Sequence, residues 1–396
     1  MQKYCFDKKY DVAVVGAGVA GIAAAIAAAR RGRKTVLIEK QTLIGGLATS
    51  GLIFVYLPLC DGNGRQLISG ISEEMLKKSC EFSPFDISKA WGGTGKHARR
   101  ADRDRYEVDF SPAGFTLSLD EMLAEAGVDL WLDTLVCDCV MQGDRITAVE
   151  VENTSGRGIV KADCFVDASG EAVLIRRAGG EVLYTENHQS MWLVETATNA
   201  SHYHFTGDLH IKSFLYDDPK IPAGAAVDAK VVTEFTRKSW KHLREYYRDN
   251  YSTVNKHENY PVNLPAMAQL RKIAAIKGKY TLTSDDLFKH YDDSIGLTGD
   301  WRTCGPAWET PFAALVPEKV DGVFAAGRCM AAVDDAWEVY RVIPTAAMTG
   351  EAAGIAAAIA SEKQCNASEV AACDVQKALQ QLNVKLHLEE VGLSPR

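Results

Sequence analysis

Three glycines near the N-terminus have the spacing of a phosphate-binding turn. Residues 16–21 read GAGVAG, so Gly16, Gly18 and Gly21 satisfy the pattern GxGxxG. In such a turn the first glycine permits a tight bend, the second lets the backbone approach a pyrophosphate, and the third lets helix and strand pack closely. The free N–H groups at the start of the following helix would bind the phosphate oxygens.

The segments around these glycines predict the elements that such a turn requires. Residues 10–16 (YDVAVVG) and 34–40 (KTVLIEK) predict short buried strands, and residues 19–32 predict a helix between them. Together they form a βαβ unit, which implies a parallel sheet with a right-handed crossover. Glu39 ends the second strand, where its carboxylate would accept hydrogen bonds from ribose hydroxyls and repel the 2′-phosphate of NADP.

The glycine pattern alone does not distinguish FAD from NAD. Three later segments resemble the FAD-dependent oxidoreductase family with the glutathione-reductase-like FAD fold, in particular the group related to fumarate-reductase-type flavoproteins and the flavin part of heterodisulfide reductase. These segments are residues 38–51 (IEKQTLIGGLATSG), 163–171 (DCFVDASGE) and 322–354. The resemblance covers most of the chain. It implies FAD as cofactor and an α/β fold, in which a Rossmann-like domain contains a central parallel sheet and a β-meander.

The resemblance also implies which residues surround the FAD. Gly327 and Arg328 match a turn beside the pyrophosphate, and Val136 matches a strand position whose backbone contacts adenine. The loop with Gly45, Gly46 and Thr49 matches a segment beside the ribityl chain and flavin ring. The full expected set is Gly16, Gly18, Val19, Ala20, Gly21, Glu39, Lys40, Gly45, Gly46, Leu47, Ala48, Thr49, Val136, Ala168, Ser169, Gly170, Gly327, Arg328, Asp335, Ile343, Thr345 and Ala346.

Residues 334–341 (DDAWEVYR) stand between two stretches that are rich in small residues. We expect a loop at the carboxyl end of a sheet strand, the usual position for ligand contacts in α/β folds. There Asp334 or Asp335 would reach ribityl or substrate hydroxyls, and Trp337 would wall the flavin pocket. Arg341 would bind an anion or a structural carboxylate.

A helix is expected directly after this segment. Pro344 suits its first turn, and Ile343 offers no side-chain cap to the free N–H groups. A flavin N1–C2=O edge would satisfy these groups, and Ala346, Gly350 and Gly354 would allow close approach on one face. The alternative is a helix that simply packs against the sheet.

Flavin chemistry needs a substrate C–H group near N5 and an acid or base for the accompanying proton. The candidates are His188, Arg271, Asp335, Tyr340 and Arg341, with His202 and His204 as further histidines. For each histidine the alternative is a structural role. Arg271 would either clamp a carboxylate or take part in a structural ion pair.

The chain has no second GxGxxG and no CxxC, so we expect electrons to pass directly between substrate and flavin. The external electron acceptor or donor stays open between oxygen, a diffusing nicotinamide and a partner protein. The expected function is hydride transfer between a small organic substrate and flavin N5. A flavoprotein electron-transfer subunit and an NAD-dependent dehydrogenase are the alternatives.

The composition excludes several classes of partner. With 44 basic and 52 acidic residues the net charge is −8, which argues against nucleic acid and anionic lipid. The longest apolar run, 346–360, is interrupted by polar residues and predicts a buried helix rather than a membrane span. The N-terminus lacks the apolar segment of a signal peptide, and we expect a cytoplasmic protein. Whether it forms a homo-oligomer stays open.

The ten cysteines show neither a redox motif nor zinc-ligand spacing, so the sequence predicts reduced core thiols and no metal site. The arginines at 99, 100, 103 and 105 alternate with aspartates and predict a solvated face or lid loop. We expect an FAD-binding domain from residues 1–183 and 301–362, with a loop-rich insertion near 52–105. A substrate or cap domain of α+β type would span 184–300, and a helical tail would span 363–396.

Overall fold

The computed structural model describes residues 4–99, 105–196, 209–253 and 255–396. Its largest sheet has the order β5-β2-β1-β8-β7-β6, with β16 also paired to β8. The parallel part consists of β1 (Phe6–Val15), β2 (Thr35–Ile38), β5 (Asp129–Trp131), β8 (Gly156–Asp167) and β16 (Val323–Ala325). The expected βαβ unit around the glycine turn and its parallel sheet are therefore confirmed.

A three-stranded antiparallel meander extends the same sheet. It consists of β6 (Leu135–Gln142), β7 (Arg145–Asn153) and the first half of β8. The second half of β8 pairs with β16, while β1 runs along the other side of the strand. This is the expected α/β architecture, in which one long strand belongs to both the parallel sheet and the meander.

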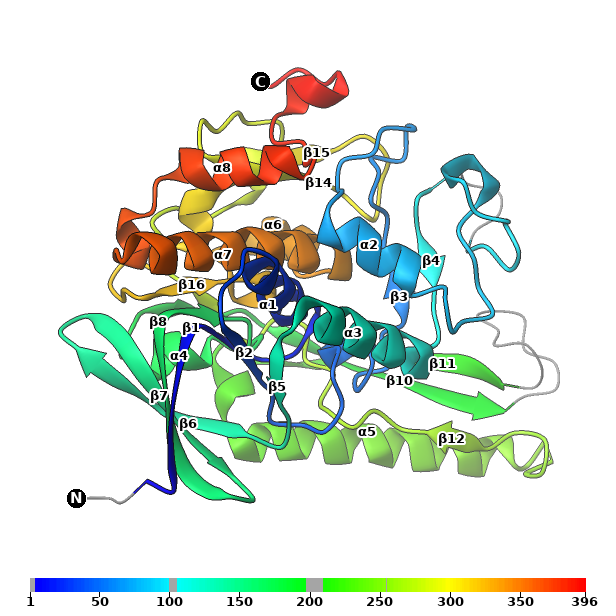
Figure 1. Cartoon of the computed structure of the whole chain (residues 1–396). Helices are drawn as coiled ribbons and strands as arrows, with labels where there is room; N and C mark the ends of the chain where they lie inside the picture. Colours follow the sequence, from blue (N-terminus) through cyan, green and yellow to red (C-terminus); the bar gives the residue numbers. More distant parts are fainter. Residues whose placement is uncertain (1–3, 100–104, 197–208, 254) are drawn as a thin grey trace.

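Three helices cover one face of the parallel sheet (Figure 1). Helix α1 (Val19–Arg30) packs between α3 (Pro112–Ala126) and α7 (Ile343–Lys363). A Cβ atom on Gly350 would lie 2.1 Å from the carbonyl oxygen of Ala20, so only glycine permits this helix contact. By length and composition α7 could cross a membrane, but 94% of its most apolar window is buried inside the protein.

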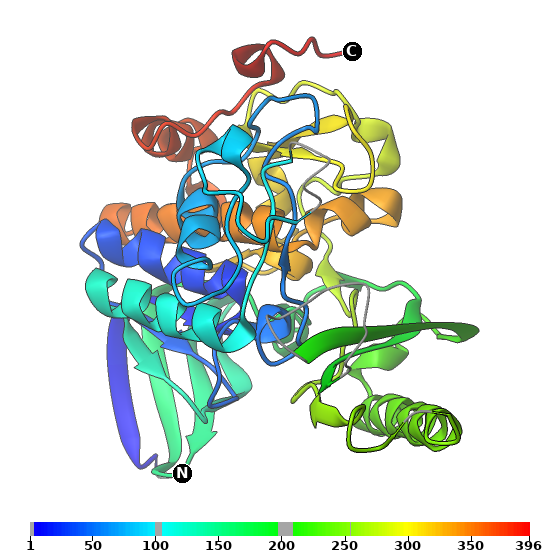
Figure 2. The same ribbon diagram turned by 90° about the vertical axis from the view of Figure 1, so that its right-hand side faces the viewer.

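A second sheet lies on the other side of the molecule (Figure 2). It contains β10 (Asn187–Thr196) between β11 (Leu209–Ile221) and β12 (Pro261–Asn263), with α5 (Ala229–Asn250) packed against it. The residues of α5 that face this sheet are spaced by four, as in an amphipathic helix: Phe235, Ser239, Leu243 and Tyr247. Strand β9 (Val182–Leu183) precedes this sheet in the sequence and β13 (Ala275–Ile276) follows it, and the two strands pair with each other.

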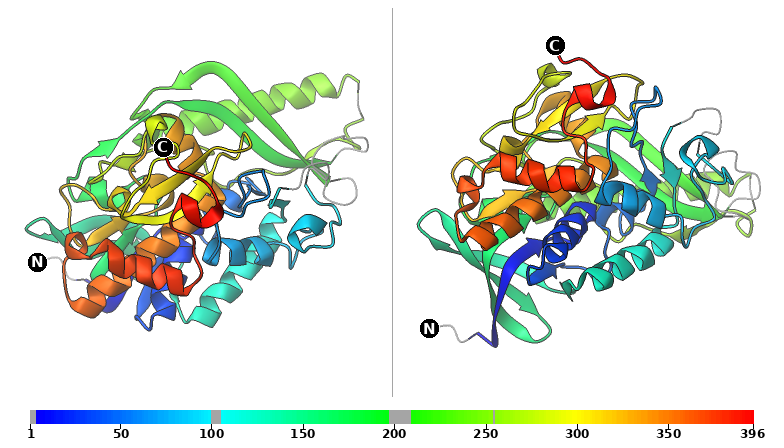
Figure 3. Two further views of the ribbon diagram at one scale, coloured as in Figure 1. Left: turned by 90° about the horizontal axis from the view of Figure 1, so that it is seen from above. Right: turned by 45° about the horizontal axis from the view of Figure 1, so that its top comes forward.

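A hairpin of β14 (Ser294–Gly299) and β15 (Ala307–Pro311) packs near the C-terminus, together with α8 (Ala372–Gln381) and the 3₁₀ turn η8 (Leu388–Val391) (Figure 3). The expected domain boundary at residues 300–301 falls between the two strands of this hairpin, so the structure offers no break there. The other short elements are η1 (Gly46–Ala48), β3 (Val55–Tyr56), α2 (Ile71–Lys78), η2 (Lys89–Trp91), β4 (Val108–Asp109), α4 (Val173–Arg177), η3 (Ala225–Val227), η4 (Ser284–Asp286), η5 (Phe312–Leu315), η6 (Gly327–Cys329) and η7 (Ala367–Glu369).

The loop expected at 334–341 is instead a short helix, α6 (Asp334–Tyr340). Two aspartates in its first turn suit the positive end of the helix dipole. Its apolar residues turn into the core, and the side chain of Trp337 is only 1% exposed. The charged residues suggested a loop, but their spacing places them on the outer side of about two helical turns.

The expected solvated face at residues 99–105 is also corrected. Arg99 is largely buried and forms an ion pair with Asp109 at 2.6 Å. The buried Arg105 donates a hydrogen bond to the carbonyl oxygen of Trp301 at 2.7 Å. The arginines at 100 and 103 lie outside the described residues. All ten cysteines are free, but those at 5, 304 and 373 are exposed rather than in the core.

Candidate functional site

A first cavity of about 280 Å³ lies at the carboxyl ends of β1, β2 and β8. It brings together Gly16, Glu39, Lys40, Val136 and Ser169, all of which the sequence assigned to the cofactor. The carboxyl ends of parallel strands meet at one edge of a sheet, which is why these distant positions converge. The sequence did not predict six further lining residues. They could have been found only from their position next to the DASG turn or at the start of β6: Thr134, Leu135, Glu171, Val173, Arg176 and Arg177.

The glycine turn has the geometry that a bound pyrophosphate requires. Gly16 has a φ of +96°, and a Cβ atom on Gly21 would lie 1.8 Å from the carbonyl oxygen of Gly16. At Gly18, by contrast, an added Cβ would meet no heavy atom of the described chain within 4 Å. No described side chain caps the N-terminus of α1, so its first N–H groups face this open space. These residues fit the pyrophosphate of FAD.

Glu39 is held by the backbone beneath the cavity. Its Oε2 atom accepts a hydrogen bond from the N–H of Ala17 at 2.7 Å, and its Oε1 atom accepts one from Gln41 at 2.9 Å. Each carboxylate oxygen has a second lone pair, which leaves Glu39 able to accept from ribose hydroxyls. The neighbouring Lys40 forms an ion pair with Glu171 at 2.7 Å across the cavity mouth.

The glycine loop that contains η1 packs directly on the phosphate turn. The N–H of Gly45 donates to the carbonyl oxygen of Ala17 at 2.7 Å. The Thr49 hydroxyl donates to the Ile44 carbonyl, so it stabilises the loop itself. The next residue, Ser50, has a buried hydroxyl that finds no partner among the described residues. A cofactor beside this loop would satisfy that group.

The N-terminus of α7 lies close to the start of α1, because a Cβ atom on Gly327 would lie 2.7 Å from that of Ala20 and 3.5 Å from that of Ala346. Pro344 lies in its first turn, and within the described chain no side chain caps it, as the sequence predicted. The Thr349 hydroxyl accepts from the N–H of Gly327 at 3.0 Å, which fixes η6 against α7. The Thr345 hydroxyl is hydrogen-bonded to that of Thr298 at 2.8 Å. Ala346 completes a small-residue surface at this end of the helix.

Arg328 joins the cofactor side of the protein to the second sheet. Its Nη1 atom donates to the carbonyl oxygen of Leu270 at 2.6 Å, and burial lowers its pKa. A Cβ atom on Gly170, which has a φ of +75°, would lie 2.2 Å from Nη2 of Arg328. The indole of Trp337 donates to the Arg328 carbonyl at 3.2 Å. Trp337 is therefore a core residue that supports this turn, and the expectation that it walls the flavin pocket is wrong.

A second cavity, of about 490 Å³, brings together three of the predicted catalytic residues, His188, Arg271 and Arg341. Successive side chains of a strand alternate between its faces, so His188, Ser190 and Trp192 of β10 all face the cavity. The remaining lining residues come from the start of β10, from β11 and from other segments: Glu186, Asn187, Ser213, Phe214, Leu215, Lys272, Trp301, Arg302 and Glu338.

Two polar groups in this cavity are buried without a hydrogen-bond partner in the described chain. They are Nη1 of Arg271 and the hydroxyl oxygen of Ser190. The Arg271 guanidinium lies over the ring of Trp192, 5.9 Å from the ring centre. Burial, together with the positive charges of Arg341 and Arg328, lowers the pKa of Arg271 to about 9. The cavity thus presents a cation and a hydroxyl with unused hydrogen-bonding capacity.

The other basic side chains of the second cavity are already paired. Arg341 and Lys272 each contact the Glu338 carboxylate at 2.5 Å. Although burial opposes its ionisation, these two cations hold the pKa of Glu338 below its usual value. Arg302 pairs with Asp300 and with a residue of α6. Among the described lysines and arginines that line the cavity, Arg271 alone has no carboxylate partner.

Two predicted catalytic residues lie elsewhere. Asp335 forms a two-pronged ion pair with Arg302 at 2.5 and 2.6 Å, which holds the pKa of Asp335 below its usual value. It therefore lies beside the rim of the second cavity and does not line the first. Tyr340 is fully buried, and its hydroxyl donates to the Glu309 carbonyl at 3.2 Å, a structural role. The histidines at 202 and 204 lie outside the described residues.

Polar contacts connect the surroundings of the two cavities. The amide of Gln269 donates to the carbonyl oxygens of Gly51 and Trp192, and its Oε1 atom accepts from the N–H of Trp192 at 2.7 Å. Gly51 ends the glycine loop, and Trp192 lines the second cavity. The ring of Phe54 also meets that of Trp192 edge to face, with centroids 5.9 Å apart. The two sites are therefore parts of one connected region.

Comparison with known proteins agrees with this geometry. Curated relatives include a digeranylgeranylglycerophospholipid reductase of Picrophilus torridus, 28% identical over 48% of this chain and 46% of the relative. An NADH:fumarate oxidoreductase of Klebsiella pneumoniae is 26% identical over 46% of this chain and 23% of the relative. Protein FixC of Bradyrhizobium diazoefficiens is 29% identical over 44% of this chain and 40% of the relative. The chain thus spans less than half of the length of each.

A solved structure has the same fold over nearly the whole chain. It is a geranylgeranyl bacteriochlorophyll reductase-like protein from Thermoplasma acidophilum, with a TM-score of 0.51 over 96% of this chain and 84% of the other. Its sequence identity of 14% supports a likeness of fold alone. The family model for FAD dependent oxidoreductases matches residues 11–271 and 223–379, which include the glycine turn and the start of α7. This chain belongs to the FAD-dependent oxidoreductase family.

Proposed function

We propose that this enzyme transfers a hydride between a small organic anion, held in the second cavity, and N5 of FAD. The observation that carries the proposal is the pair of buried groups without partners, Nη1 of Arg271 and the Ser190 hydroxyl, in one cavity. A buried donor that lacks an acceptor costs about 1–3 kcal/mol. A carboxylate offers acceptors for both groups and neutralises the guanidinium.

The surrounding charges favour an anion without competing for it. Arg341, Lys272 and Arg302 are each paired with carboxylates, so they raise the local potential but leave the direct contact to Arg271. Arg271 has a planar guanidinium that can bind a carboxylate through two parallel hydrogen bonds. We therefore infer a carboxylic acid, or another compact organic anion, as the substrate class.

His188 is the proposed acid or base of the reaction. It lies on the cavity face of β10, two residues from Ser190, and its imidazole is exposed to the cavity. Imidazole is the commonest general acid or base in enzyme sites, which suits proton transfer to or from a bound substrate. Bound FAD would supply the hydride acceptor or donor. The chain's own residues orient the anion and move the proton.

The test begins with the purified protein, which is expected to be yellow and to release FAD on denaturation. Carboxylic acids, amino acids, sugars and enoates are then screened without oxygen for bleaching of the oxidised flavin, or for reoxidation of the reduced flavin. An organic acid is expected to react. Bleaching by a partner protein alone would favour an electron-transfer subunit. A colourless protein that cannot be reconstituted with FAD would contradict the assignment of the first cavity to FAD.

The role of Arg271 is tested with two variants. Arg271→Gln is expected to raise the KM for the organic acid at least about 100-fold, because one charge-assisted two-pronged contact contributes roughly 3 kcal/mol. Arg271→Lys keeps the charge and is expected to recover part of that loss. The matched control is Arg237→Gln, which changes an exposed arginine on α5 and is expected to leave KM unchanged. An unchanged KM in Arg271→Gln would contradict the proposal.

A further inference from the structure

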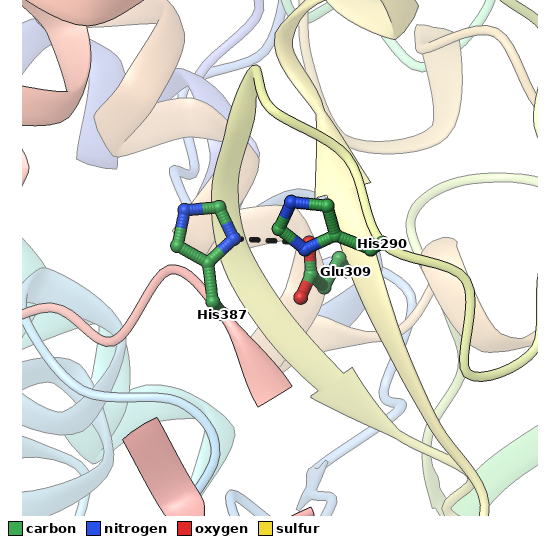
Figure 4. Close-up of side chains that lie close together, drawn as sticks. All are labelled: His290, Glu309 and His387. Carbon is green, nitrogen blue, oxygen red and sulfur yellow. Dashed lines mark hydrogen bonds and ion pairs between the residues drawn. The ribbon is translucent and has the colours of Figure 1, made fainter. Parts of the chain in front are cut away.

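Three side chains from separate parts of the chain meet beside the β14–β15 hairpin (Figure 4). His290 precedes β14, Glu309 lies in β15, and His387 immediately precedes η8 near the C-terminus. Each offers one nitrogen or oxygen ligand atom, and all three atoms lie within 4.8 Å of one another. None of these residues lines either cavity described above. The cluster is therefore separate from the cofactor and substrate sites.

The distances within the cluster suit one small metal ion. The Nδ1 atom of His387 lies 3.1 Å from Oε2 of Glu309, and Nδ1 of His290 lies 3.4 Å from the same oxygen. A tetrahedral zinc ion with bonds of about 2.0–2.2 Å holds neighbouring ligand atoms roughly 3.4 Å apart. The two imidazole rings lie with their centres 4.9 Å apart and are tilted by 35°. Both histidines thus approach the same carboxylate from neighbouring positions.

The carboxylate of Glu309 supplies the electrostatic reason for a cation. This side chain is 0% exposed, and its oxygens accept hydrogen bonds from the backbone N–H groups of Tyr291 at 2.8 Å and Leu388 at 2.9 Å. In the described ranges of the chain, no lysine or arginine pairs with it. A buried carboxylate without a permanent cation is costly. Among the described residues, the side chains that form ion-pair contacts with Glu309 are the imidazoles of His290 and His387. Its carboxylate oxygens have further lone pairs that could bind a metal.

We propose that His290, Glu309 and His387 bind one divalent transition-metal ion, for which Zn²⁺ is the best match. Two imidazoles and one carboxylate favour zinc over magnesium or calcium, which prefer oxygen ligands. The side chains of His290 and His387 are 42% and 26% exposed, so water can supply the fourth ligand.

Such an ion would clamp the C-terminal segment onto the hairpin. Existing contacts already hold the two together: the Ser294 hydroxyl donates to the Leu386 carbonyl at 2.6 Å, and the N–H of Leu388 donates to Oε1 of Glu309 at 2.9 Å. The same hairpin continues through Asp300 into Arg302 at the rim of the second cavity. The metal would thus stabilise the hairpin that carries Asp300 and Arg302 at the rim, without contacting the substrate.

The test uses the full chain without a histidine tag, after treatment with a chelator and gel filtration. Zn²⁺ is added and followed by calorimetry, and the metal retained after a second gel filtration is measured by elemental analysis. Co²⁺ replaces Zn²⁺ in a parallel titration, because its visible spectrum reports coordination by nitrogen and oxygen. We expect about one retained ion per chain and a higher melting temperature with Zn²⁺.

The variants His290→Ala and His387→Ala are each expected to weaken zinc binding at least about tenfold and to abolish the stabilisation. His257→Ala, which changes an exposed histidine near β12, is the matched control and is expected to bind zinc like the unchanged protein. The FAD content and metal-free melting temperature of each variant show that it is folded. Absence of zinc binding, or binding that survives both variants, would overturn the proposal, and neither result depends on the substrate reaction.

Discussion

The guanidinium of Arg271 lies over the indole ring of Trp192, 5.9 Å from its centre. A cation over an aromatic face gains roughly 0.5–2 kcal/mol. Nη1 of Arg271 has no hydrogen-bond partner in the described chain, so it is free to bind an anion. The backbone of Trp192 is in turn held by Gln269, which also binds the carbonyl of Gly51 in the glycine loop. The position of the cation is therefore coupled to the loop expected beside the flavin.

Anion binding in the second cavity is expected to weaken at high pH. Burial and the neighbouring Arg341 and Arg328 lower the pKa of Arg271 to about 9, so the free protein loses the cation as pH rises through that value. The dissociation constant of the organic acid should be constant near neutral pH and rise about tenfold for each unit above about pH 9. Flavin difference spectra at increasing pH measure this constant. A flat profile up to about pH 11 would show that Arg271 stays charged throughout.

Two glycine variants are expected to separate folding from cofactor binding. Gly18→Ala adds a methyl group where no heavy atom of the described chain lies within 4 Å, and the φ of −72° is ordinary. The fold should persist, but the methyl group enters the space for the pyrophosphate, so FAD affinity should fall at least about tenfold. Gly21→Ala would place a Cβ 1.8 Å from a backbone oxygen and should prevent folding.

Thermal unfolding of the FAD-free protein and a flavin titration measure these two effects. If Gly18→Ala bound FAD as tightly as the unchanged protein, the pyrophosphate would not lie over this turn. Loss of the fold in Gly18→Ala would mean that the open space has a structural role.

Asp335→Asn distinguishes the observed ion pair from the ribityl contact that the sequence suggested. Arg302 would lose its partner on α6 but keep Asp300, with which it pairs at 2.8 Å. The FAD dissociation constant should stay within about twofold, because Asp335 does not reach the first cavity. The freed charge should lower the KM for an organic anion by about two- to threefold, the scale of an exposed ion pair. A tenfold loss of FAD affinity would instead support a contact between Asp335 and the cofactor.

The stability of the protein is expected to depend on a buried carboxyl group in α7. Glu351 is 1% exposed, its Oε2 atom accepts from the N–H of Ile71 at 3.0 Å, and its Oε1 atom has no partner in the described chain. Burial raises its pKa to about 7 from the usual 4.5. Because the folded state binds this proton more tightly, the stabilisation is complete below about pH 4.5 and is lost as pH rises through about 7.

Glu351→Gln should remove this pH dependence. At about pH 8 the variant is expected to be more stable than the unchanged protein by up to roughly 3 kcal/mol, and near pH 5 the two should be similar. Denaturant unfolding at both pH values measures the difference. Glu125→Gln, which changes an exposed residue of α3, is the matched control. A variant that is less stable at pH 8 would show that Glu351 is ionised and needed in that form.

Local patterns predicted the part of the fold that depends on short stretches of chain. Gly16, Gly18 and Gly21 lie between a buried strand and a helix. Their spacing together with this context identified the phosphate turn. The start of α7 was also predicted from the local sequence. A proline favours the first turn of a helix, and a residue that cannot cap leaves the first N–H groups without a side-chain partner. The prediction of a loop at 334–341 was wrong. The charged residues suggested a loop, but the segment is a helix, and the inner side of that helix carries Trp337 into the core.

The sequence by itself determined the βαβ unit, since this follows from residue types at fixed short spacings. The resemblance of three longer segments implied the family and the cofactor. Only the tertiary structure decided which side chains meet in the substrate cavity and in the proposed metal site. Arg271 and Ser190 line the same cavity because β10 alternates its side chains and because the segment after β12 returns to the glycine loop. His387 reaches Glu309, 78 residues away in sequence, because the chain passes through α7 and α8 before it returns to the hairpin. No local pattern encodes such contacts, which depend on how whole elements pack.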